Sequence, residues 1–548
     1  MKAKPFLQGA GLATLYIAPF AADFLTPTLG DAYRRLHPLT TIYRAIVLVA
    51  IGLWIGSGIA FWVLERLPER WKRIFWLIPL ALLPWLFLRS VVAAFTDWPG
   101  TAILVLHIMH VVAPAAAILS VGLLLLSRAI GPAPYDKYVT GFRTFYKIAG
   151  FGLLVILPQM GRYALHSEPR EQPAFEKANL PPVPASSRRI VWILMDELSY
   201  DQVFDHRQPD VALPNFGNLA RSSVSFSALQ PAGQWTEEVV PALLLGKPVV
   251  ALRKPYPGPP SYRSSPDGPW LRFNQYDTIF ADAQSLGWSS GVAGWYNPYC
   301  RLLPNVLDRC FWQYSEAGHL NLGSSPRSTN SVTENMIEMV PFHTRILTQI
   351  HRTVPSPNGP HRDDYTSMMA HAQDLLNDSR IRFVFVHLPI PHPPGIYDRR
   401  SHTVNDQGTY LDNLVLADQS LGALRDVIRS TPAAANTTLI VSSDHSWRTY
   451  WWKGSGAWSA EAMRATHGGR FDPRPVLMVQ LPGGITGQVI AKPVNAMIVH
   501  RILEGLLRGH LQTAADFNEL VNQQPQEPAA DLRQNQINSA PVAMPRGD

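Results

Sequence analysis

The sequence predicts an N-terminal multi-span α-helical membrane domain followed by an α/β domain with a mostly parallel central sheet. Long apolar runs are confined to the first 165 of the 548 residues, although 47% of the whole chain is hydrophobic. Beyond that point, short continuous apolar runs alternate with stretches of helical spacing. Because continuous apolar runs are typical of strands buried on both faces, this alternation indicates a parallel sheet covered by helices.

These patterns divide the chain into four parts. Residues 1–165 form the predicted transmembrane domain, 166–188 a linker rich in proline and charge, 189–515 the catalytic domain, and 516–548 a tail rich in Gln, Asn and Pro. The tail lacks apolar periodicity, so we expect it to be disordered. The catalytic part is long enough for one large α/β core.

Several N-terminal segments are long and apolar enough to cross a bilayer. They are residues 43–64, 74–95, 102–126 and 148–165, with 9–29 as a candidate fifth. A cleaved signal peptide is not expected, because the start of the chain is followed by repeated spans rather than by one short apolar region and a cleavage site. We therefore expect four or five spans that remain in the mature protein.

Basic residues in the short loops set the predicted orientation. They are Arg66, Arg70, Lys72 and Arg73 in one loop, and Arg128, Lys137, Arg143 and Lys147 in another. Both loops should be cytoplasmic, and one further span then places the catalytic domain outside. Arg34, Arg35 and Arg44 favour the opposite side for the first loop, which leaves the first span open. We expect a multi-pass protein of the cell inner (plasma) membrane with a periplasmic or extracellular catalytic domain.

The chain contains two cysteines, Cys300 and Cys310. In an oxidising compartment they could form one disulfide that closes a short loop. Two unpaired cysteines are the alternative. The net charge of +7 follows in part from the basic loops between spans, so it does not call for a nucleic-acid partner.

Polar side chains with metal-binding chemistry follow three of the predicted strands. They are Asp196 and Glu197 after Arg189–Met195, His387 after 383–386, and Asp444 and His445 after 439–443. Ligands of α/β sheets bind at the carboxyl ends of the strands, so these side chains should share one edge. Carboxylates with an imidazole suit a divalent cation such as Zn²⁺ or Mn²⁺. Capping or loop hydrogen bonding by the Asp residues is the alternative interpretation.

Residues 213–247, LPNFGNLARSSVSFSALQPAGQWTEEVVPALLLGK, resemble the sulfatase-family segment in which a Pro-Asn opening, a helix and a strand lead to the catalytic nucleophile. Thr236 lies ten residues before Gly246, where a sulfatase has its modified Cys or Ser. It also lies five residues before Pro241, as in phosphoethanolamine transferases. The resemblance therefore implies that Thr236 is the nucleophile.

Four further motifs extend this resemblance in the same order. ILMDELSYD (193–201) resembles the first metal motif, HLPIPHPP (387–394) the His-x4-His stretch of the transferases, SSDH (442–445) the second metal motif, and THGG (466–469) the final active-site histidine. The helical anchor also matches the layout of phosphoethanolamine transferases and lipoteichoic acid synthases. The chain is thus identified as a member of the sulfatase-like branch of the alkaline phosphatase superfamily.

Departures from the family pattern narrow the expected chemistry. Sulfatases generate formylglycine within a C/S-x-P-x-R signature, where this chain has Thr236, Glu238 and Val240. The Gly-Lys-Trp-His segment is replaced by GWY (294–296), and the transferase Asp-His-Gly-Glu by DHSW (444–447). The sequence therefore favours phosphoryl transfer over sulfate-ester hydrolysis.

The resemblance also implies roles for the candidate site residues. Asp196, Glu197, Thr236, Asp444 and His445 would hold a divalent ion, zinc or manganese, and His387, His392 and His467 would bind substrate oxygens or protonate the leaving group. A second ion could sit among the three histidines. Hydrogen bonding within loops is the alternative for each of them.

The function that we expect from the sequence is transfer of a phospho-headgroup, of the phosphoethanolamine or phosphoglycerol type, from a lipid donor to a cell-envelope acceptor. A membrane anchor raises the effective concentration of such a donor. Hydrolysis of a phosphodiester or a sulfuric ester is one alternative. A catalytically silent glycan-binding domain is another, and it predicts that the metal ligands are missing. The expected partners are the bilayer, the donor and the acceptor, with no nucleic acid.

Overall fold

The structure is a computed structural model of the chain. It describes residues 3–25, 39–76, 132–166, 174–177, 180–253, 259–314, 332–340, 359–453, 458–484 and 486–525, with the single positions 118, 122 and 125. The chain forms two units. The first comprises Met1–Glu171, Pro255–Pro257 and Ala317–Val354, and the second comprises Gln172–Lys254, Gly258–Glu316 and Pro355–Asp548.

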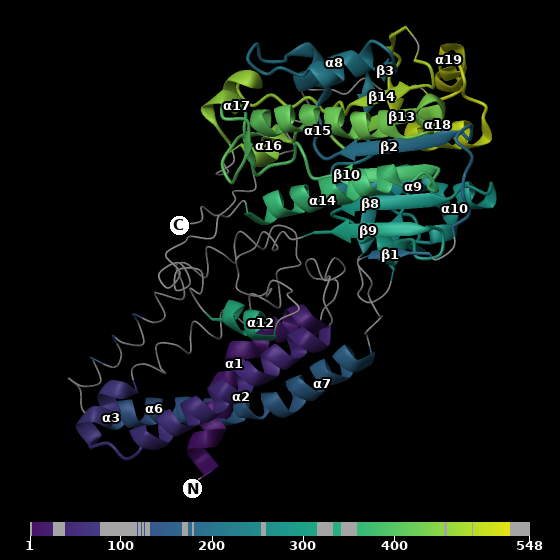
Figure 1. Ribbon diagram of the computed structural model, residues 1–548. Coiled ribbons are helices and arrows are strands. Elements are labelled where there is room, and N and C mark those ends of the chain that lie inside the picture. Colours follow the sequence, from purple (N-terminus) through teal and green to yellow (C-terminus); the bar gives the residue numbers. More distant parts are fainter. Residues whose placement is uncertain are drawn as a thin grey trace. The chain divides into compact units, whose positions relative to one another are not determined.

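The first unit is helical in its described residues (Figure 1). Its helices are α1 (Ala3–Leu25), α2 (Leu39–Leu64), α3 (Glu69–Phe75), α6 (Pro132–Gly150), α7 (Gly152–His166) and α12 (Val332–Glu338). Helix α1 packs against α2, α6 and α7. A Cβ on Gly9 would lie 2.6 Å from the backbone nitrogen of Gly58 in α2, so these helices approach at glycines. Close approach at small residues is typical of helix packing in membranes.

Among the residues that the structure describes, two helical segments are long and apolar enough to cross a membrane, Leu39–Leu64 and Val139–His166. In their most apolar stretches, 22% and 28% of the residues are buried. They coincide with the predicted spans 43–64 and 148–165. Most of span 74–95 and almost all of span 102–126 lie outside the described residues, and α1 occupies the candidate span 9–29.

Helix α12 lies within residues 189–515, the range that the sequence assigns to the catalytic domain, but it belongs to the helical unit. Met339, which follows the helix, is buried in the core formed by α1, α2 and α7. The Tyr16 hydroxyl of α1 donates a hydrogen bond to the Met339 carbonyl oxygen. The apolar side chains of this segment therefore complete the helical unit.

The second unit is built on one large sheet. Nine strands in the described residues form it, in the spatial order β1 (Ala174–Glu176), β9 (Arg309–Gln313), β8 (Ser290–Trp295), β10 (Phe383–Leu388), β2 (Arg189–Met195), β13 (Thr437–Ser443), β14 (Leu477–Gln480), β3 (Val224–Phe226) and β15 (Gln488–Ile490). The strands from β9 to β13 are parallel, whereas β1 and β14 pair antiparallel with their neighbours. The sheet is mixed, with the predicted parallel arrangement at its centre.

The three central strands end at the same level. His387 of β10 pairs with Leu194 of β2, and Ser443 of β13 pairs with Met195 of β2. Every residue of these strands is buried, as the continuous apolar runs predict for a sheet covered on both faces. The residues that follow the three strands therefore meet at one edge.

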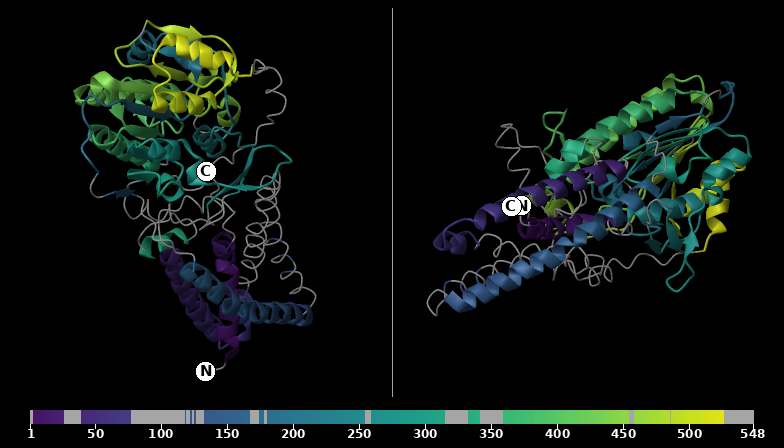
Figure 2. Two further views of the ribbon diagram at one scale, coloured as in Figure 1. Left: turned by 90° about the vertical axis from the view of Figure 1, so that its right-hand side faces the viewer. Right: turned by 90° about the horizontal axis from the view of Figure 1, so that it is seen from below.

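Helices cover both faces of this sheet (Figures 1 and 2). One layer contains α8 (Pro214–Ala220), α14 (Gly359–Asn377) and α15 (Tyr410–Ser430), and the other contains α9 (Thr236–Leu245), α10 (Ile279–Ser285) and α18 (Ile498–Arg508). Shorter helices are α11 (Tyr299–Leu302), α16 (Thr449–Trp452) and α17 (Ala460–Ala465). Minor sheets are formed by β4 (Leu229–Gln230) with β16 (Val494–Asn495), by β5 (Ala251–Arg253), β6 (Ser261–Arg263) and β7 (Leu271–Arg272), and by β11 (Tyr397–Asp398) with β12 (Thr403–Val404).

Two elements lie across the predicted boundaries of the catalytic domain. Strand β1 lies within the predicted linker 166–188 and pairs with β9, so part of this segment belongs to the sheet. At the other end, α19 (Ala514–Asn522) crosses the predicted start of the tail at residue 516. A capping box at Thr513 and the buried Phe517 and Val521 stabilise this helix. Residues 526–548 lie outside the described residues.

Cys300 and Cys310 form a disulfide that joins α11 to β9. The bond closes a short loop and fixes Tyr299, whose hydroxyl lies 2.7 Å from Nδ1 of His387. Of the two alternatives left open by the sequence, the structure has the paired one. A disulfide is typical of an oxidising compartment.

Replacing both cysteines by serine is expected to lower the free energy of unfolding by about 2.5 kcal/mol, the loop-closure value for a loop of roughly ten residues. Denaturant unfolding of the catalytic unit, followed by tryptophan fluorescence in detergent, measures the change. Reduced wild-type protein is the matched comparison and should lose a similar amount. Equal midpoints for oxidised, reduced and doubly substituted protein would contradict this expectation.

Candidate active site

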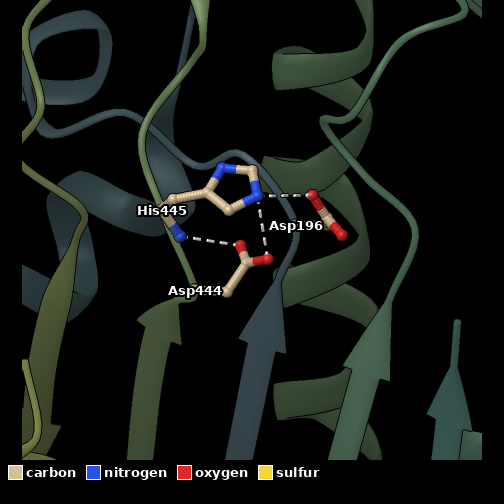
Figure 3. A group of neighbouring side chains, drawn as sticks. All are labelled: Asp196, Asp444 and His445. Atoms are coloured by element: carbon tan, nitrogen blue, oxygen red, sulfur yellow. Dashed lines mark hydrogen bonds and ion pairs between the residues drawn. The ribbon is translucent and has the colours of Figure 1, made fainter. Parts of the chain in front are cut away.

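Asp196 and Asp444 follow directly after β2 and β13, and the pairing of Met195 with Ser443 places them side by side. Both carboxylates are fully buried, and His445 is almost as deeply buried. Figure 3 shows the two carboxylates converging on the His445 imidazole beyond the strand ends. Within the described ranges, these three residues are the one group of metal-ligating side chains whose donor atoms all lie within 4.8 Å of one another.

Thr236, the first residue of α9, also contacts this group. Its Oγ1 donates a hydrogen bond to Oδ2 of Asp196 at 3.1 Å and lies 3.3 Å from Nε2 of His445. The same His445 nitrogen lies 3.2 Å from Oδ2 of Asp444 and 3.8 Å from Oδ1 of Asp196. The N-terminus of a helix carries partial positive charge, which favours an anion at the Thr236 hydroxyl.

Burial and neighbouring charges perturb the pKa values of this group. Burial, followed by the charges of Asp444 and Glu197, raises the pKa of Asp196 well above its usual value. Burial also lowers the pKa of His387 and of His445 to about 4. Both imidazoles are therefore neutral at neutral pH, which is the form that binds metal ions.

The residues of this group fit a divalent cation. Oδ1 of Asp196 and Oδ2 of Asp444 are buried without a hydrogen-bond donor, as is Nε2 of His387, which lies 3.7 Å from Oδ2 of Asp196. Buried anionic oxygens without donors are costly unless a cation compensates them. Two carboxylates, an imidazole and a hydroxyl provide oxygen and nitrogen donors suited to zinc or manganese. Four of the five predicted ligands are thus together: Asp196, Thr236, Asp444 and His445.

Glu197, the fifth predicted ligand, lies apart from this group. Its carboxylate accepts hydrogen bonds from Nε of Arg448 and, at 2.9 and 3.1 Å, from Nε1 of Trp452. Glu197 has a φ of 64°, an unusual conformation for a residue with a side chain. The Glu197 carboxylate is therefore bound by Arg448 and by Trp452 of α16.

Arg448 was not predicted from the sequence. It is 5% exposed and forms an ion pair with Glu197. Although burial disfavours its charge, Glu197, Asp196 and Asp444 outweigh burial and raise the pKa of Arg448, so it stays cationic. The signal in the sequence was the departure after SSDH, where Ser-Trp stands in place of the transferase Gly-Glu and Arg448 follows directly.

His387 and His392 lie next to the group. The ring of His387 is held by the Tyr299 hydroxyl at Nδ1. The backbone N–H of His392 donates to the Asp196 carbonyl oxygen at 3.0 Å, and its ring packs against Trp295 and Trp452, with centroid distances of 5.5 and 5.3 Å. Strand β10 therefore holds His387, and the proline-rich loop that follows it holds His392, beside Asp196.

His467 is not brought to this group. It is exposed after α17, with a φ of 48°, and its ring lies against that of His206. The predicted second ion among His387, His392 and His467 therefore has no support in the described residues. The turn formed by His467, Gly468 and Gly469, all with positive φ, directs the chain to the surface there.

A family model supports the resemblance seen in the sequence. The model described as Sulfatase matches residues 188–472, slightly more than half of the chain. The chain belongs to the sulfatase family. This confirms the assignment to the sulfatase-like branch of the alkaline phosphatase superfamily and makes the protein an enzyme of that class. The matched range contains Asp196, Thr236, Asp444 and His445.

Several solved structures are similar to this sulfatase-family chain. Ps i-CgsB in complex with k-i-k-neocarrahexaose has 16% sequence identity and a TM-score of 0.38, with 60% of this chain and 74% of that chain covered. Phosphonate monoester hydrolase of Agrobacterium radiobacter has 13% identity and a TM-score of 0.37, with 62% and 78% covered. BT1596, a 2-O GAG sulfatase, has 12% identity and a TM-score of 0.37, with 62% and 76% covered. The search of curated proteins found no match.

Adding Zn²⁺ or Mn²⁺ to chelator-treated enzyme is expected to raise its melting temperature at neutral pH. The cation binds the folded group but not the dispersed ligands of the unfolded chain, and at 100 times the Kd the gain is about 2.7 kcal/mol. Differential scanning fluorimetry in detergent, with and without chelator, measures the change. Identical melting temperatures near pH 7.5 would contradict a cation site at this group.

The same stabilisation should decrease as the pH falls. Because the pKa of Asp196 is raised, a proton competes with the cation for this carboxylate as the pH falls through that pKa. Binding of the proton also stabilises the ion-free folded protein. In ion-free protein, the imidazoles of His387 and His445 have the opposite effect on the free energy of unfolding as the pH falls. Their folded pKa of about 4 lies below the unfolded value of about 6.5, so their stabilising contribution is lost between these values as the pH falls. Comparison with and without cation at each pH separates the two effects.

Proposed function

We propose that this sulfatase-family enzyme transfers a phospho-headgroup from a lipid donor to a cell-envelope acceptor through a covalent intermediate on Thr236. The observation that carries the proposal is the buried Thr236 hydroxyl, 3.1 Å from Oδ2 of Asp196 and 3.3 Å from Nε2 of His445. A threonine is not a precursor of formylglycine. The hydroxyl itself is therefore the nucleophile in this proposal.

Asp196, Asp444 and His445 would hold a divalent cation, which lowers the pKa of a nearby hydroxyl and offsets charge on phosphoryl oxygens. Thr236 Oγ1 forms a bond to phosphorus, the bond from phosphorus to the donor alcohol breaks, and that alcohol leaves with a proton. In the second step an acceptor hydroxyl attacks the same phosphorus and Thr236 recovers its proton. The two steps therefore require a group beside Oγ1 that can accept a proton and later return it.

His387 is suited to move that proton. Its Nε2 is buried without a hydrogen-bond partner and lies 3.7 Å from the Asp196 oxygen that accepts from Thr236. Its ring is neutral at neutral pH, and Tyr299 fixes its orientation at Nδ1. A neutral, oriented imidazole can accept a proton and return it.

The lipid donor is supported by the apolar helices Leu39–Leu64 and Val139–His166 on the same chain. A tether to the bilayer raises the effective concentration of membrane lipids at the enzyme. We accordingly propose a multi-pass inner-membrane enzyme whose partners are a phospholipid donor and an envelope glycan or lipid acceptor.

Mass spectrometry tests this proposal directly. Peptides that contain Thr236 should carry a phospho-headgroup in enzyme from cells, and envelope lipids or glycans of the same cells should carry that group on a hydroxyl. Cells that express Thr236→Ala should lack both. A modified acceptor that persists with Thr236→Ala would refute the covalent route.

Hydrolysis is the second candidate, and membership in the sulfatase family favours it. Water would then release the group from Thr236 in place of an acceptor alcohol. Turnover of a phosphodiester in ¹⁸O water distinguishes the two. Label in the released phosphate ester identifies hydrolysis, whereas an unlabelled group on an added acceptor identifies transfer.

A further inference from the structure

Three arginines lie together where the central strands begin, at the edge of the sheet opposite the candidate active site. Arg188 directly precedes β2, Arg189 is its first residue, and Arg382 directly precedes β10. The Ile190 backbone N–H donates to the Arg382 carbonyl oxygen at 2.8 Å, so the parallel register places the two strand starts side by side (Figure 1). Strand β2 separates this edge from Asp196 by about 23 Å. The cluster is therefore distinct from the candidate active site.

The three arginines line one cavity of about 260 Å³. Two serines, Ser187 and Ser379, also line it, and the remaining residues of its wall are apolar. None of the described residues around this cavity carries a carboxylate. All hydrogen bonds that the three guanidinium groups make with described residues go to backbone carbonyl oxygens. The cavity wall thus carries positive charge that no lining side chain neutralises.

Arg189 is the most deeply buried cation of this wall, with 2% of its surface exposed. Its Nε and Nη2 donate to carbonyl oxygens, whereas Nη1 is buried without a hydrogen-bond partner among the described residues. Burial lowers its pKa to about 10, against the opposing charge of Asp378, so Arg189 is cationic at neutral pH. The Asp378 carboxylate itself pairs with Arg380 and Arg309. The buried charge of Arg189 is therefore compensated only in part, which is unfavourable.

Arg382 and Arg188 lie around the same ring, that of Trp288. Their guanidinium carbons are 4.0 and 5.5 Å from its centroid. Arg382 is half-buried, its Nε donates to the Arg188 carbonyl oxygen at 3.3 Å, and its Nη nitrogens make no hydrogen bond with a described residue. Burial, followed by the charge of Arg188, lowers the pKa of Arg382. An arginine held through Nε and a tryptophan face presents two N–H donors suited to two oxygens of one anion.

We propose that this cavity is a second, non-catalytic site that binds the phosphate group of a phosphate monoester, with Arg382 as the bidentate donor and Arg188 and Arg189 as surrounding charge. Three cations without a lining carboxylate favour a dianion. The cavity is slightly smaller than the roughly 300 to 1,000 Å³ typical of ligand pockets, so the phosphate carries a short organic group. The monoester is either a soluble organic phosphate or the headgroup of a phosphatidic-acid lipid, which share this chemistry. The proposal does not depend on the chemistry at Thr236.

Isothermal titration of the full-length enzyme tests the site, with chelator present so that no divalent cation is bound near Thr236. The soluble probes are inorganic phosphate and glycerol 3-phosphate, added to enzyme in detergent. The lipid probe is phosphatidic acid in nanodiscs, compared with phosphatidylcholine nanodiscs. Binding of glycerol 3-phosphate identifies a soluble ligand, whereas binding restricted to phosphatidic acid identifies a lipid. If neither soluble probe nor phosphatidic acid bound, the proposal would be overturned.

Substitutions at Arg382 place the bound phosphate at this cavity. Arg382→Gln should weaken binding about 10- to 100-fold, as for loss of a charge-assisted hydrogen bond, and Arg382→Glu should abolish it. Both variants should fold, because the side chain is half-buried and makes one hydrogen bond to a carbonyl oxygen. Phosphodiester turnover in phosphate-free buffer should equal that of wild type, which confirms the fold independently. Wild-type phosphate affinity in folded Arg382→Gln protein would overturn the proposal.

Two controls exclude other sites for the phosphate. Arg253 also lies over a tryptophan, 4.0 Å from the ring centroid of Trp270, but it belongs to β5 and does not line the cavity. Arg253→Gln should therefore leave phosphate affinity unchanged, and a loss equal to that of Arg382→Gln would mean that phosphate follows overall charge alone. Thr236→Ala should bind as wild type does. Loss of phosphate binding in that variant would place the anion at the candidate active site and overturn the proposal.

Discussion

Replacing Thr236 by alanine is expected to lower turnover by at least about 10⁴-fold, because the substitution removes the atom that forms the covalent bond. Divalent cation binding should persist, since Asp196, Asp444 and His445 are unchanged. The fold should persist too. The hydroxyl donates a hydrogen bond to Asp196 and lies 3.3 Å from Nε2 of His445, and a net loss at this site should change the free energy of unfolding by about 1 kcal/mol. Steady-state turnover of a chromogenic phosphodiester and a thermal melt measure the two effects.

Thr236→Ser is the first control for this prediction. Serine keeps the hydroxyl at the first position of α9, so activity within about tenfold of wild type is expected. The second control is Thr449→Ala. Thr449 is also buried at the first position of a nearby helix, but its hydroxyl donates to the Gly469 carbonyl oxygen at 3.0 Å and not to the metal-ligating group. If Thr449→Ala and Thr236→Ala lost activity equally, Thr236 would have no special role.

The central strands could be predicted from the sequence because burial on both faces leaves a strong signal. Residues 190–195 are an uninterrupted apolar run, and the strand that contains them has the predicted bounds Arg189–Met195. The edge strands gave no such signal. β1 has only three residues and alternates in exposure, so its pairing with β9 depends on tertiary contacts that local patterning does not reveal.

The candidate site could be predicted in part, for a related reason. Asp196, Asp444 and His445 follow predicted strands directly, so their proximity follows from the sheet register. The residues that contact the Glu197 carboxylate cannot be predicted from the register of the sheet. Arg448 and Trp452 come from a loop and a short helix, and loop conformation is set by the whole fold. A carboxylate at a strand end can therefore be placed from sequence, whereas its ion-pair partner cannot.

Replacing Asp196 by asparagine is expected to affect stability and function in opposite directions. The raised pKa of Asp196 shows that its charge is unfavourable in the ion-free fold, where burial, Asp444 and Glu197 all oppose it. Above that pKa the ionised carboxylate therefore costs stability, and a neutral isostere removes this cost. Ion-free Asp196→Asn should be more stable than ion-free wild type near pH 7.5, by about 1 to 3 kcal/mol.

Function should fall in the same variant. Loss of one anionic ligand weakens cation binding, and the several kcal/mol of charge stabilisation that the cation provides correspond to a turnover decrease on the order of 10³-fold. Mn²⁺ should then no longer raise the melting temperature. Asp418→Asn is the matched control, because Asp418 is also buried with a raised pKa but accepts from the backbone amides of Asn215 and Phe216. The Asp418→Asn protein should still be stabilised by Mn²⁺. If ion-free Asp196→Asn protein were less stable than ion-free wild type, the buried Asp196 carboxylate would be satisfied without a cation, which contradicts the prediction.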